Sequence, residues 1–259
     1  MRTVVHLSDL HFGRADAGVA AVLLDEVRRL SPDVVAVSGD LTQRARRRQF
    51  RQARAFLHAL PHPCVIVPGN HDVPLYNVFA RFLDPLGGFR KTITSNLQPS
   101  YASDELVVAG INTTRSLTIS DGRVRPDDLA HVRRVFDASD GDIVKVVVGH
   151  HPFDDAAHVE LLTAFGTDVF LTGHLHLSYT GGTAARYTAA GRSAIVVEAG
   201  TAISTRMRGE ANAFNVLRIE RDRIVVATMR WQEASGRFGE ADARTFNRAD
   251  DGWRAAGAE

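Results

Sequence analysis

Short apolar runs alternate along the chain with longer stretches in which apolar residues recur every three or four positions. Runs that are apolar throughout predict strands covered on both faces, and the longer stretches predict helices. The predicted strands of this alternating region are residues 3–7, 34–37, 65–67, 106–111, 144–148, 169–171 and 195–197. The predicted helices are residues 19–30, 46–60 and 126–136, the last with a proline at its start.

The end of the chain has a different pattern. Residues 213–219 and 224–229 are apolar and flank the charged residues 220–223, which predicts a β-hairpin. Alternating strands and helices followed by a strand-rich half predict an α/β fold with two packed sheets. From residue 233 the chain is polar, and we expect a single domain over residues 1–232 and a loosely ordered tail over 233–259.

Five of the predicted strands end in polar residues that are able to bind metal ions. Ligands of open α/β sheets bind beyond the carboxyl ends of the strands, and Asp, Asn and His are poor strand residues but good ligands. Glycine, present in four of the five motifs, lets the backbone turn sharply. The motifs are Ser8-Asp9-Leu10-His11, Ser38-Gly39-Asp40, Pro68-Gly69-Asn70-His71-Asp72, Gly149-His150-His151-Pro152 and Thr172-Gly173-His174-Leu175-His176.

The spacing of these side chains suits a pair of metal ions. Residues two apart project to the same side of an extended chain, so Asp9 with His11, and His174 with His176, are each expected to grip an ion from one loop. Asp40, Asn70 and His150 follow separate strands. Seven ligands exceed what one tetrahedral ion needs but suit two ions that share a carboxylate. Mixed imidazole and carboxylate ligation favours Mn, Fe or Zn over Ca or Mg.

The charge of such a centre predicts its chemistry. Two carboxylates leave excess positive charge on two divalent ions, which attracts an anion and generates hydroxide. Both are needed to attack a phosphate ester. We therefore expect hydrolysis of a phosphodiester, in which metal-activated hydroxide attacks the phosphorus.

Composition excludes several other classes of protein. The 259 residues include 31 Lys and Arg against 30 Asp and Glu, so bulk charge gives no strong nucleic-acid signal. The single cysteine, Cys64, excludes a disulfide framework and a Cys-rich zinc site. The sequence contains no apolar run of the roughly 20 residues that a transmembrane segment needs. The N-terminus enters a predicted strand without a signal-peptide pattern, and we expect a cytoplasmic protein.

The five motifs resemble those of the calcineurin-like metallophosphoesterase superfamily, which are Asp-x-His, Gly-Asp, Gly-Asn-His-Asp/Glu, Gly-His and Gly-His-x-His. The resemblance runs from Asp9 to His176 and implies a four-layer α-β-β-α sandwich with a dinuclear site at the sheet edge. It implies that one metal takes Asp9, His11 and His176. The other metal takes Asn70, His150 and His174, and Asp40 bridges the two.

The resemblance also implies catalytic residues. His71 would contact the phosphate and protonate the leaving oxygen, and Asp72 or Asp40 would orient its ring. The expected substrate-binding residues are His11, Asn70, His71, Asn112 and Arg115.

Two positions depart from the family pattern or leave a choice. Gln43 stands where many members carry a further Asp, which predicts altered tuning of the site but no loss of metal. His150 fits the fourth motif better than His151, because it lies two residues before Pro152, and His151 is the second choice.

Three motifs, and the segment Gly110-Ile111-Asn112-Thr113-Thr114-Arg115, resemble the bacterial class III cyclic-nucleotide phosphodiesterase branch. This favours a small nucleotide substrate such as cyclic AMP. The alternatives are a broad phosphoesterase for phospholipid headgroups, nucleic-acid ends or phosphoproteins, and a non-catalytic scaffold that kept the fold.

Three further segments leave alternatives open. The basic run Arg44–Arg48 is either the solvated start of a helix or a contact for phosphates. The apolar residues of segment 73–86 suit either a lipid-linked substrate or core packing. The C-terminal hairpin either packs on the second sheet or pairs across a homodimer.

Overall fold

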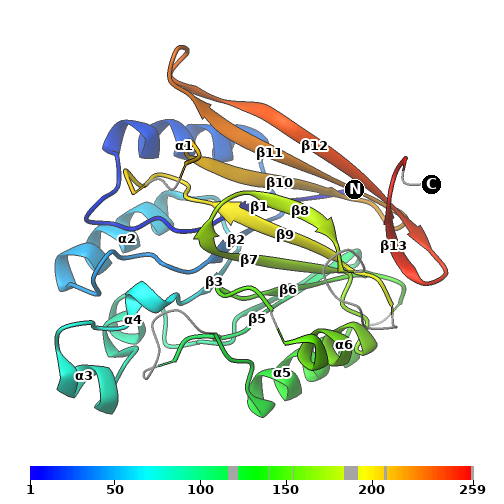
Figure 1. Cartoon of the computed structure of the whole chain (residues 1–259), viewed down its shortest axis with the longest axis horizontal. Coiled ribbons are helices and arrows are strands. Elements are labelled where there is room, and N and C mark those ends of the chain that lie inside the picture. The colour runs from blue at the N-terminus through cyan, green and yellow to red at the C-terminus, as the bar shows by residue number, and fades with distance from the viewer. Residues whose placement is uncertain (116–121, 140, 154, 184–191, 207–208, 258–259) are drawn as a thin grey trace.

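The computed structural model describes residues 1–257 apart from 116–121, 140, 154, 184–191 and 207–208. Two mixed sheets pack face to face, and helices cover the outer face of each (Figure 1). This arrangement confirms the expected four-layer α-β-β-α sandwich.

The first sheet combines the N-terminal strands with the C-terminal ones. Strands β1, β2 and β3 are parallel, and β10 to β13 continue the sheet from β1 in antiparallel pairs. The spatial order is β13 (Gly252–Ala255), β12 (Arg237–Ala249), β11 (Arg223–Gln232), β10 (Ala213–Ile219), β1 (Arg2–Leu7), β2 (Val34–Ser38) and β3 (Cys64–Val67). The predicted β-hairpin is the pair β10 and β11.

The second sheet is parallel at its centre and antiparallel at both edges. Its spatial order is β4 (Ser100–Ala102), β5 (Leu106–Gly110), β6 (Val144–Val148), β7 (Val169–His176), β9 (Ile195–Gly200) and β8 (Tyr179–Gly182). The carboxyl ends of β1, β2, β3, β6 and β7 meet at one edge of the sandwich, on the left in Figure 1.

The helices form the outer layers. The longer ones are α1 (Ala17–Leu30), α2 (Arg47–Ala59), α5 (Pro126–Asp137) and α6 (Ala156–Ala164). Short helices η1 (Asn70–Asp72), α3 (Val78–Leu83) and α4 (Gly87–Thr92) follow β3. The Asp16 carboxylate caps α1 by accepting from the backbone N–H groups of Gly18 and Val19. Among the helices of the described residues, not one has both the length and the apolar character that a bilayer crossing requires.

The apolar runs are buried on both faces because each strand lies between two cores. In β1, Val4 packs into the core between the two sheets, whereas Val5 and Leu7 pack under α1 and α2. In β5, Val108 faces the same central core and Val107 faces α5 and α6. Strands covered on both faces hold their carboxyl ends in a fixed position, which is the property that a site built there needs.

The expectation of a loosely ordered tail after residue 232 was wrong. Residues of that segment form β12 and β13, and β12 pairs along the length of β11. Trp253 of β13 is only 1% exposed, and its indole N–H donates to Asp168 Oδ1 at 2.8 Å. Polar composition misled the sequence analysis because β12 is an outer strand with one solvated face.

We expect the substitution Trp253→Ala to lower the free energy of unfolding by about 3–5 kcal/mol, because it leaves a cavity and removes one of the hydrogen bonds to the buried Asp168 carboxylate. Urea denaturation followed by circular dichroism measures this loss. The neighbouring Arg254→Ala is the control, because the Arg254 side chain is 67% exposed and its removal should leave the urea midpoint close to that of the wild type. Equal stability of the two variants would contradict the place of β13 in the fold.

Candidate metal centre and active site

The structure brings the five strand-end motifs together at one edge of the sandwich. Asp9 and His11 follow β1, Asp40 follows β2, and Asn70 and His71 lie in η1 after β3. The second sheet supplies the remaining residues from the end of β6 and from β7, which are His150, His174 and His176. Side chains from both sheets therefore face each other across the end of the central core.

The backbone of the site is held in an uncommon conformation. Five of the seven predicted ligands have positive φ angles, a region that residues with a Cβ seldom adopt. They are Asp9 (53°), His11 (47°), Asp40 (52°), His174 (72°) and His176 (62°). Such strain persists only where the surrounding structure imposes it, and it gathers at functional sites.

This conformation corrects the expectation that each pair of residues two apart grips one ion from an extended loop. His174 and His176 diverge, because each has left-handed backbone and the register of β7 with β9 is irregular between Thr172 and His176. His174 reaches Asn70, whereas His176 reaches Asp9. Asp9 and His11 do converge, and His11 Nε2 lies 3.4 Å from Asp9 Oδ1.

The first ligand cluster consists of Asp9, His11 and His176. The Nε2 atoms of the two histidines are 3.1 Å apart, and His176 Nε2 is 3.1 Å from Asp9 Oδ1. All three side chains are buried. Two ring nitrogens that face each other beside a carboxylate need either a shared proton or a cation that they both bind.

The second ligand cluster consists of Asn70, His150 and His174. Asn70 Oδ1 lies 2.9 Å from His150 Nε2 and 3.0 Å from His174 Nδ1. The opposite ring nitrogen of His150 donates to the carbonyl oxygen of Ser38 at 2.7 Å. This bond leaves the Nε2 lone pair of His150 facing the cluster, which is how metal-binding imidazoles are oriented.

Asp40 lies between the two clusters. Its Oδ2 atom is 3.7 Å from His11 Nε2, and its Oδ1 atom is 3.4 Å from His150 Nε2. Oδ1 also accepts the backbone N–H of His71 at 2.8 Å, which fixes the carboxylate. One carboxylate therefore reaches both clusters, as two ions with a shared ligand require.

The donor set fits divalent metal ions. Asp9 Oδ1 and Asp40 Oδ2 are buried and, within the described part of the chain, have no hydrogen-bond partner. Burial lowers the pKa of His11 and lowers that of His150 to about 4, so both imidazoles are neutral at physiological pH. Ligands bind metals in this deprotonated form.

The two carboxylates differ in their electrostatic surroundings. Burial raises the pKa of Asp40 well above its usual value, and the charges of Asp9 and Asp72 add to this effect. Burial acts in the same direction on Asp9, but contacts with His11 and His176 hold its pKa well below the usual value. A cation near Asp40 would relieve the repulsion among these carboxylates.

Glycines on the loops leave room for the clusters. Gly39 has a φ of +92°, and a Cβ there would meet His150 Nδ1 and the backbone nitrogen of Gly69, both at 2.8 Å. A Cβ on Gly69 would clash with Asp40 Oδ1. Any side chain at these two positions would displace Asp40 or His150.

The structure distinguishes the two neighbouring histidines of the fourth motif. Thr113 Oγ1 accepts the backbone N–H groups of His150 (3.3 Å) and His151 (3.2 Å), and it lies 2.9 Å from His151 Nδ1. Having accepted two hydrogen bonds, the hydroxyl donates its own proton to His151 Nδ1, so His151 Nε2 carries the ring proton. That nitrogen is then a donor and offers a metal no lone pair.

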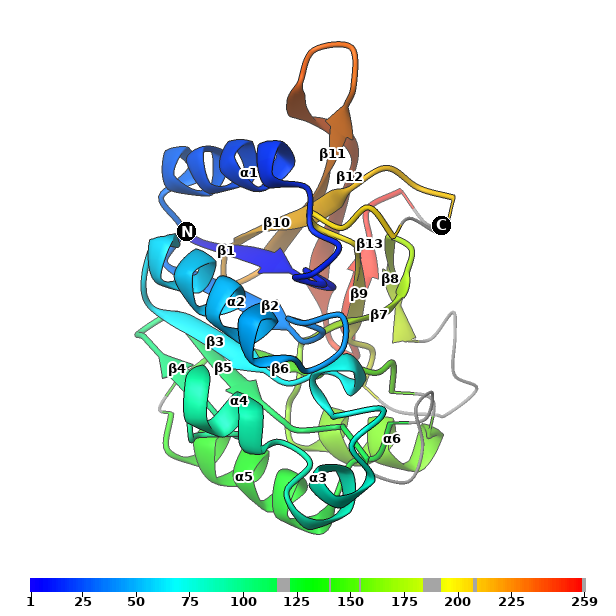
Figure 2. The same ribbon diagram turned by 90° about the vertical axis from the view of Figure 1, so that its left-hand side faces the viewer.

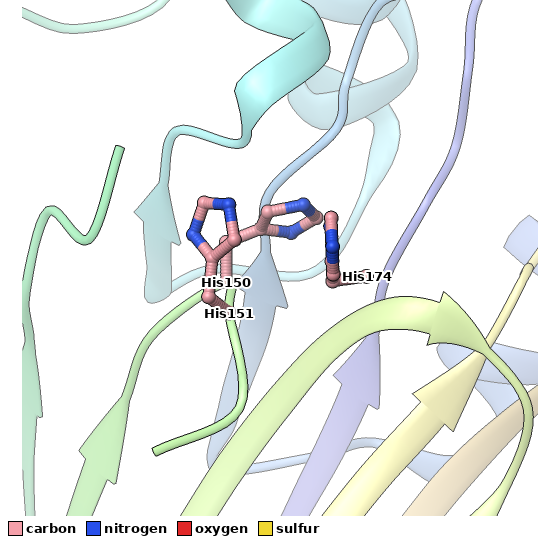
Figure 3. Close-up of side chains that lie close together, drawn as sticks. All are labelled: His150, His151 and His174. Carbon is pink, nitrogen blue, oxygen red and sulfur yellow. The ribbon is translucent and has the colours of Figure 1, made fainter. Parts of the chain in front are cut away.

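His151 nevertheless lies close to the second cluster. Figure 3 shows the three imidazoles of His150, His151 and His174 gathered above the strand ends. The ring centres of His151 and His174 are 4.7 Å apart, and nitrogens of all three rings lie within 4.8 Å of one another. His151 thus packs against the cluster, while the lone pair of His150 faces it.

His71 lies beside the first cluster with its ring fixed. Its Nδ1 atom is 2.9 Å from the carbonyl oxygen of Gln43, closer than its contact with Arg44 Nη1 at 3.3 Å. A carbonyl only accepts, so Nδ1 carries the proton and Nε2 accepts from Arg206 Nη1 at 2.9 Å. Burial and the charges of His11, Arg206 and Arg44 lower the pKa of His71 to about 3.

The expectation that Asp72 orients the His71 ring was wrong. The Asp72 carboxylate accepts the backbone N–H groups of Leu41, Thr42 and Gly69, and the Thr42 hydroxyl. It therefore ties the β2 and β3 loops together. Asp40 acts on the backbone of His71, and its Oδ2 atom is 4.0 Å from the ring Nε2. The Gln43 carbonyl holds the ring, a contact that does not depend on the side chain at this position.

Asn112 and Arg115, the two substrate-binding residues expected from segment 110–115, differ in position. Asn112 is buried, and its Oδ1 atom accepts from the backbone N–H and the hydroxyl of Thr114. It therefore shapes a turn, and this oxygen is already engaged. Arg115 is half-buried and immediately precedes residues outside the described part of the chain.

The sequence analysis assigned Arg206 no role, although the basic segment that begins at this residue could be expected to form a loop near the site. Arg206 follows β9 by several residues and contacts His71, which is 135 positions away in the chain. No metal-binding or catalytic pattern surrounds it in the sequence, so only the folded structure shows its place.

Comparison with known proteins agrees with the fold and the motifs. The family model for calcineurin-like phosphoesterases matches residues 2–178, which is more than half of the chain. The chain therefore belongs to the calcineurin-like phosphoesterase family. The matched region contains every residue of the two ligand clusters.

Among curated proteins, the chain is similar to glycerophosphodiester phosphodiesterase GpdQ of Enterobacter lignolyticus. The two are 30% identical over 162 residues, which cover 58% of this chain and 56% of GpdQ. The match thus spans little more than half the length of that relative.

Among solved structures, two similar ones share the fold at low identity. Purple acid phosphatase PPD1 from yellow lupin seeds has a TM-score of 0.69 and 14% identity, over 96% of this chain and 54% of that one. Vps29 of Chaetomium thermophilum has a TM-score of 0.53 and 12% identity, over 96% and 98% of the two chains. These likenesses confirm the architecture alone.

Proposed function

We propose that this chain is a phosphodiesterase that uses two divalent metal ions, with Mn, Fe or Zn as the candidate metals. The observation that carries the proposal is the pair of ligand clusters joined by Asp40. One ion would be held by Asp9, His11 and His176, and the other by Asn70, His150 and His174. Asp40 would bind both.

Such ions, when bound, supply positive charge for the phosphate oxygens and a strong nucleophile at neutral pH. The chain itself supplies the position of the substrate. Arg206 lies where it can donate to an anionic phosphate oxygen, since its guanidinium already donates to His71 Nε2. His11 and Asn70 each belong to one of the two clusters, so a phosphate that binds to both ions would lie beside these two side chains.

His71 supplies the proton in this proposal. In the substrate-free protein its Nε2 atom accepts from Arg206 and has no proton to give. An anionic phosphate would compete for the Arg206 guanidinium and bring negative charge beside the ring, and both effects raise the pKa of His71. Nε2 can then be protonated and donate to the leaving oxygen. The Gln43 carbonyl keeps the ring oriented throughout.

Two substrate classes have specific support. The motifs at residues 8–13, 38–42 and 68–72 resemble the class III cyclic-nucleotide phosphodiesterases, which favours a 3′,5′-cyclic nucleotide such as cyclic AMP. The similarity to GpdQ favours a glycerophosphodiester. Both are small phosphodiesters, and both fit a site that takes its charge from two cations and an arginine.

A product screen of the Mn-loaded protein tests the proposal and separates the two classes. The substrates are cyclic AMP, glycerophosphocholine, a dinucleotide, a short DNA and bis-p-nitrophenyl phosphate, with phosphate monoester products identified by mass spectrometry. We expect turnover of bis-p-nitrophenyl phosphate and of at least one small diester. Absence of hydrolysis at full metal occupancy would contradict the enzyme and favour a non-catalytic scaffold.

The choice between His150 and His151 gives a prediction of its own. We expect His150→Ala to lower the affinity for Mn by about 10²-fold or more, because it removes a lone pair from the second cluster. His151→Ala should change the affinity for Mn by less than about tenfold, since the Nε2 atom of His151 carries a proton and offers no lone pair. Calorimetric titration of the metal-free variants measures both constants. A larger loss in His151→Ala would reverse the assignment.

A further inference from the structure

The most exposed apolar surface of the described residues lies on and beside α3. Five large apolar side chains gather within residues 76–83, and we call them the α3 patch. Their exposed fractions are 74% for Tyr76, 59% for Val78, 80% for Phe79, 55% for Phe82 and 82% for Leu83. Isolated apolar residues are normal on a protein surface, but a contiguous group of this kind marks an interaction site.

Core packing does not account for this segment. Its ends are anchored, because Val73 and Leu86 are each only 3% exposed. Helix α3 between them has no buried residue. Of the two explanations that the sequence left open for residues 73–86, core packing therefore holds for the ends only.

The surface beside the α3 patch is strongly basic. Residues 41–102 contain nine Lys and Arg against two Asp and no Glu, in a chain whose net charge is +1. Of the two carboxylates, Asp72 is buried among the loops and Asp84 pairs with Arg90. The exposed face of α2 carries the arginines Arg47, Arg48, Arg51 and Arg54.

The helices that carry these arginines and the α3 patch lie on one side of the molecule (Figure 2). Helix α2 packs against α4, and Figure 2 shows α2, α4 and α3 facing the viewer together. Helix α3 also lies next to the site, because Arg81 of α3 lines a small cavity with Arg44, Asn70 and His71. The α3 patch is therefore close to the candidate active site.

We propose that the α3 patch and the arginine face of α2 dock together on an anionic lipid surface. Exposed aromatic and aliphatic side chains next to arginines are the composition of interfacial membrane-binding segments. Each arginine near an anionic leaflet adds to the attraction, and the apolar side chains enter the boundary between headgroups and acyl chains. Docked in this way, the cavity at Arg81 would lie close to the headgroups.

Two other occupants fit the observations less well. A second copy related by two-fold symmetry would bring the same patch of both chains together. Arg81 and Lys91 of the two copies would then approach each other, and no additional carboxylate would offset the repulsion between them. A nucleic acid would use the arginines and stack bases on Tyr76 or Phe79. It would have no use for Val78 and Leu83, whose exposed side chains are aliphatic.

Co-sedimentation of the full chain with vesicles tests the proposal. Vesicles of phosphatidylcholine alone are compared with vesicles that also contain phosphatidylglycerol, at low and high salt. We expect about tenfold or stronger binding to the anionic vesicles, weakened by salt. The double variant Phe79→Ser/Leu83→Ser should lose about tenfold or more of this binding while unfolding at the wild-type urea concentration.

Matched variants assign the effect to each part of the surface. Leu161→Ser removes an exposed apolar side chain of α6 and should bind as the wild type does. Arg48→Gln/Arg51→Gln should reduce the preference for anionic vesicles. Equal binding to both vesicle types, or unchanged binding of Phe79→Ser/Leu83→Ser, would overturn the proposal. The proposal would also be overturned if the wild type formed a dimer in light scattering, or bound an oligonucleotide, and Phe79→Ser/Leu83→Ser abolished that association but left vesicle binding unchanged.

Failure of this proposal is distinguishable from failure of the proposed function. Vesicle binding is measured without turnover, and hydrolysis of soluble bis-p-nitrophenyl phosphate should be the same in the wild type and in Phe79→Ser/Leu83→Ser. Only the significance of placing the candidate active site near the headgroups rests on the proposed function. A chain that binds vesicles and hydrolyses no diester would contradict that function alone.

Discussion

The variant Asp40→Asn should lose at least one of two bound Mn ions and about 10³-fold or more in phosphodiester turnover. The Asp40 carboxylate reaches imidazoles of both clusters, with oxygens 3.7 Å from His11 Nε2 and 3.4 Å from His150 Nε2. Metal ions supply several kcal/mol of transition-state stabilisation, and each 1.4 kcal/mol corresponds to about tenfold in rate. Metal analysis after gel filtration and bis-p-nitrophenyl phosphate kinetics measure the two effects.

The metal-free Asp40→Asn protein should not be less stable than the metal-free wild type. Burial and the charges of Asp9 and Asp72 raise the pKa of Asp40, so its ionised form opposes folding at neutral pH. The amide keeps an oxygen to accept the His71 N–H and carries no charge. Asp25→Asn, at a side chain 80% exposed, is the control for both measurements. Full occupancy of both metals in Asp40→Asn would refute the shared-ligand role.

The second large effect is expected from His71→Ala. Turnover of a diester with a poor leaving group, such as glycerophosphocholine or cyclic AMP, should fall by about 10²–10⁴-fold, because the leaving alkoxide loses its proton donor. Hydrolysis of bis-p-nitrophenyl phosphate should fall much less, since p-nitrophenolate leaves without protonation. Metal content should stay at the wild-type level, because the two ring nitrogens of His71 face the Gln43 carbonyl and the Arg206 guanidinium.

The comparison between leaving groups makes this prediction specific. An equal loss for both ester types would leave His71 as a phosphate contact and remove its role as general acid. His58→Ala is the matched control, because His58 lies on the exposed face of α2. Arg206→Ala should weaken binding of both esters alike, since its guanidinium is proposed to hold the phosphate whatever the leaving group.

Much of the fold could be predicted from the sequence because its strands are apolar on both faces. Successive residues such as Val4 and Val5 pack into different cores, so apolar residues follow one another along the strand. A strand with one solvated face would alternate apolar and polar residues. The outer strands carry no such signal. Strand β12 pairs with β11 through its backbone, and the burial of Trp253 depends on that pairing. Nothing in the local composition of residues 233–259 reveals it.

The convergence of the site could be predicted for a related reason. Parallel strands bring their carboxyl ends to one edge, so motifs after β1, β2, β3, β6 and β7 had to meet. The details depended on backbone angles that spacing does not encode. His174 and His176 part because both have positive φ. Arg206 reaches His71 through the fold alone, and Asp72 faces backbone donors that the sequence does not identify.

Anomalous diffraction at the manganese edge, from crystals grown with Mn, tests the central claim most directly. We expect two peaks about 3.5–4 Å apart, the spacing typical of paired metal sites. One should be bound by Asp9, His11 and His176, the other by Asn70, His150 and His174, and an Asp40 oxygen should lie within bonding distance of both. A single peak, or two peaks of which only one is bound by Asp40, would contradict the account.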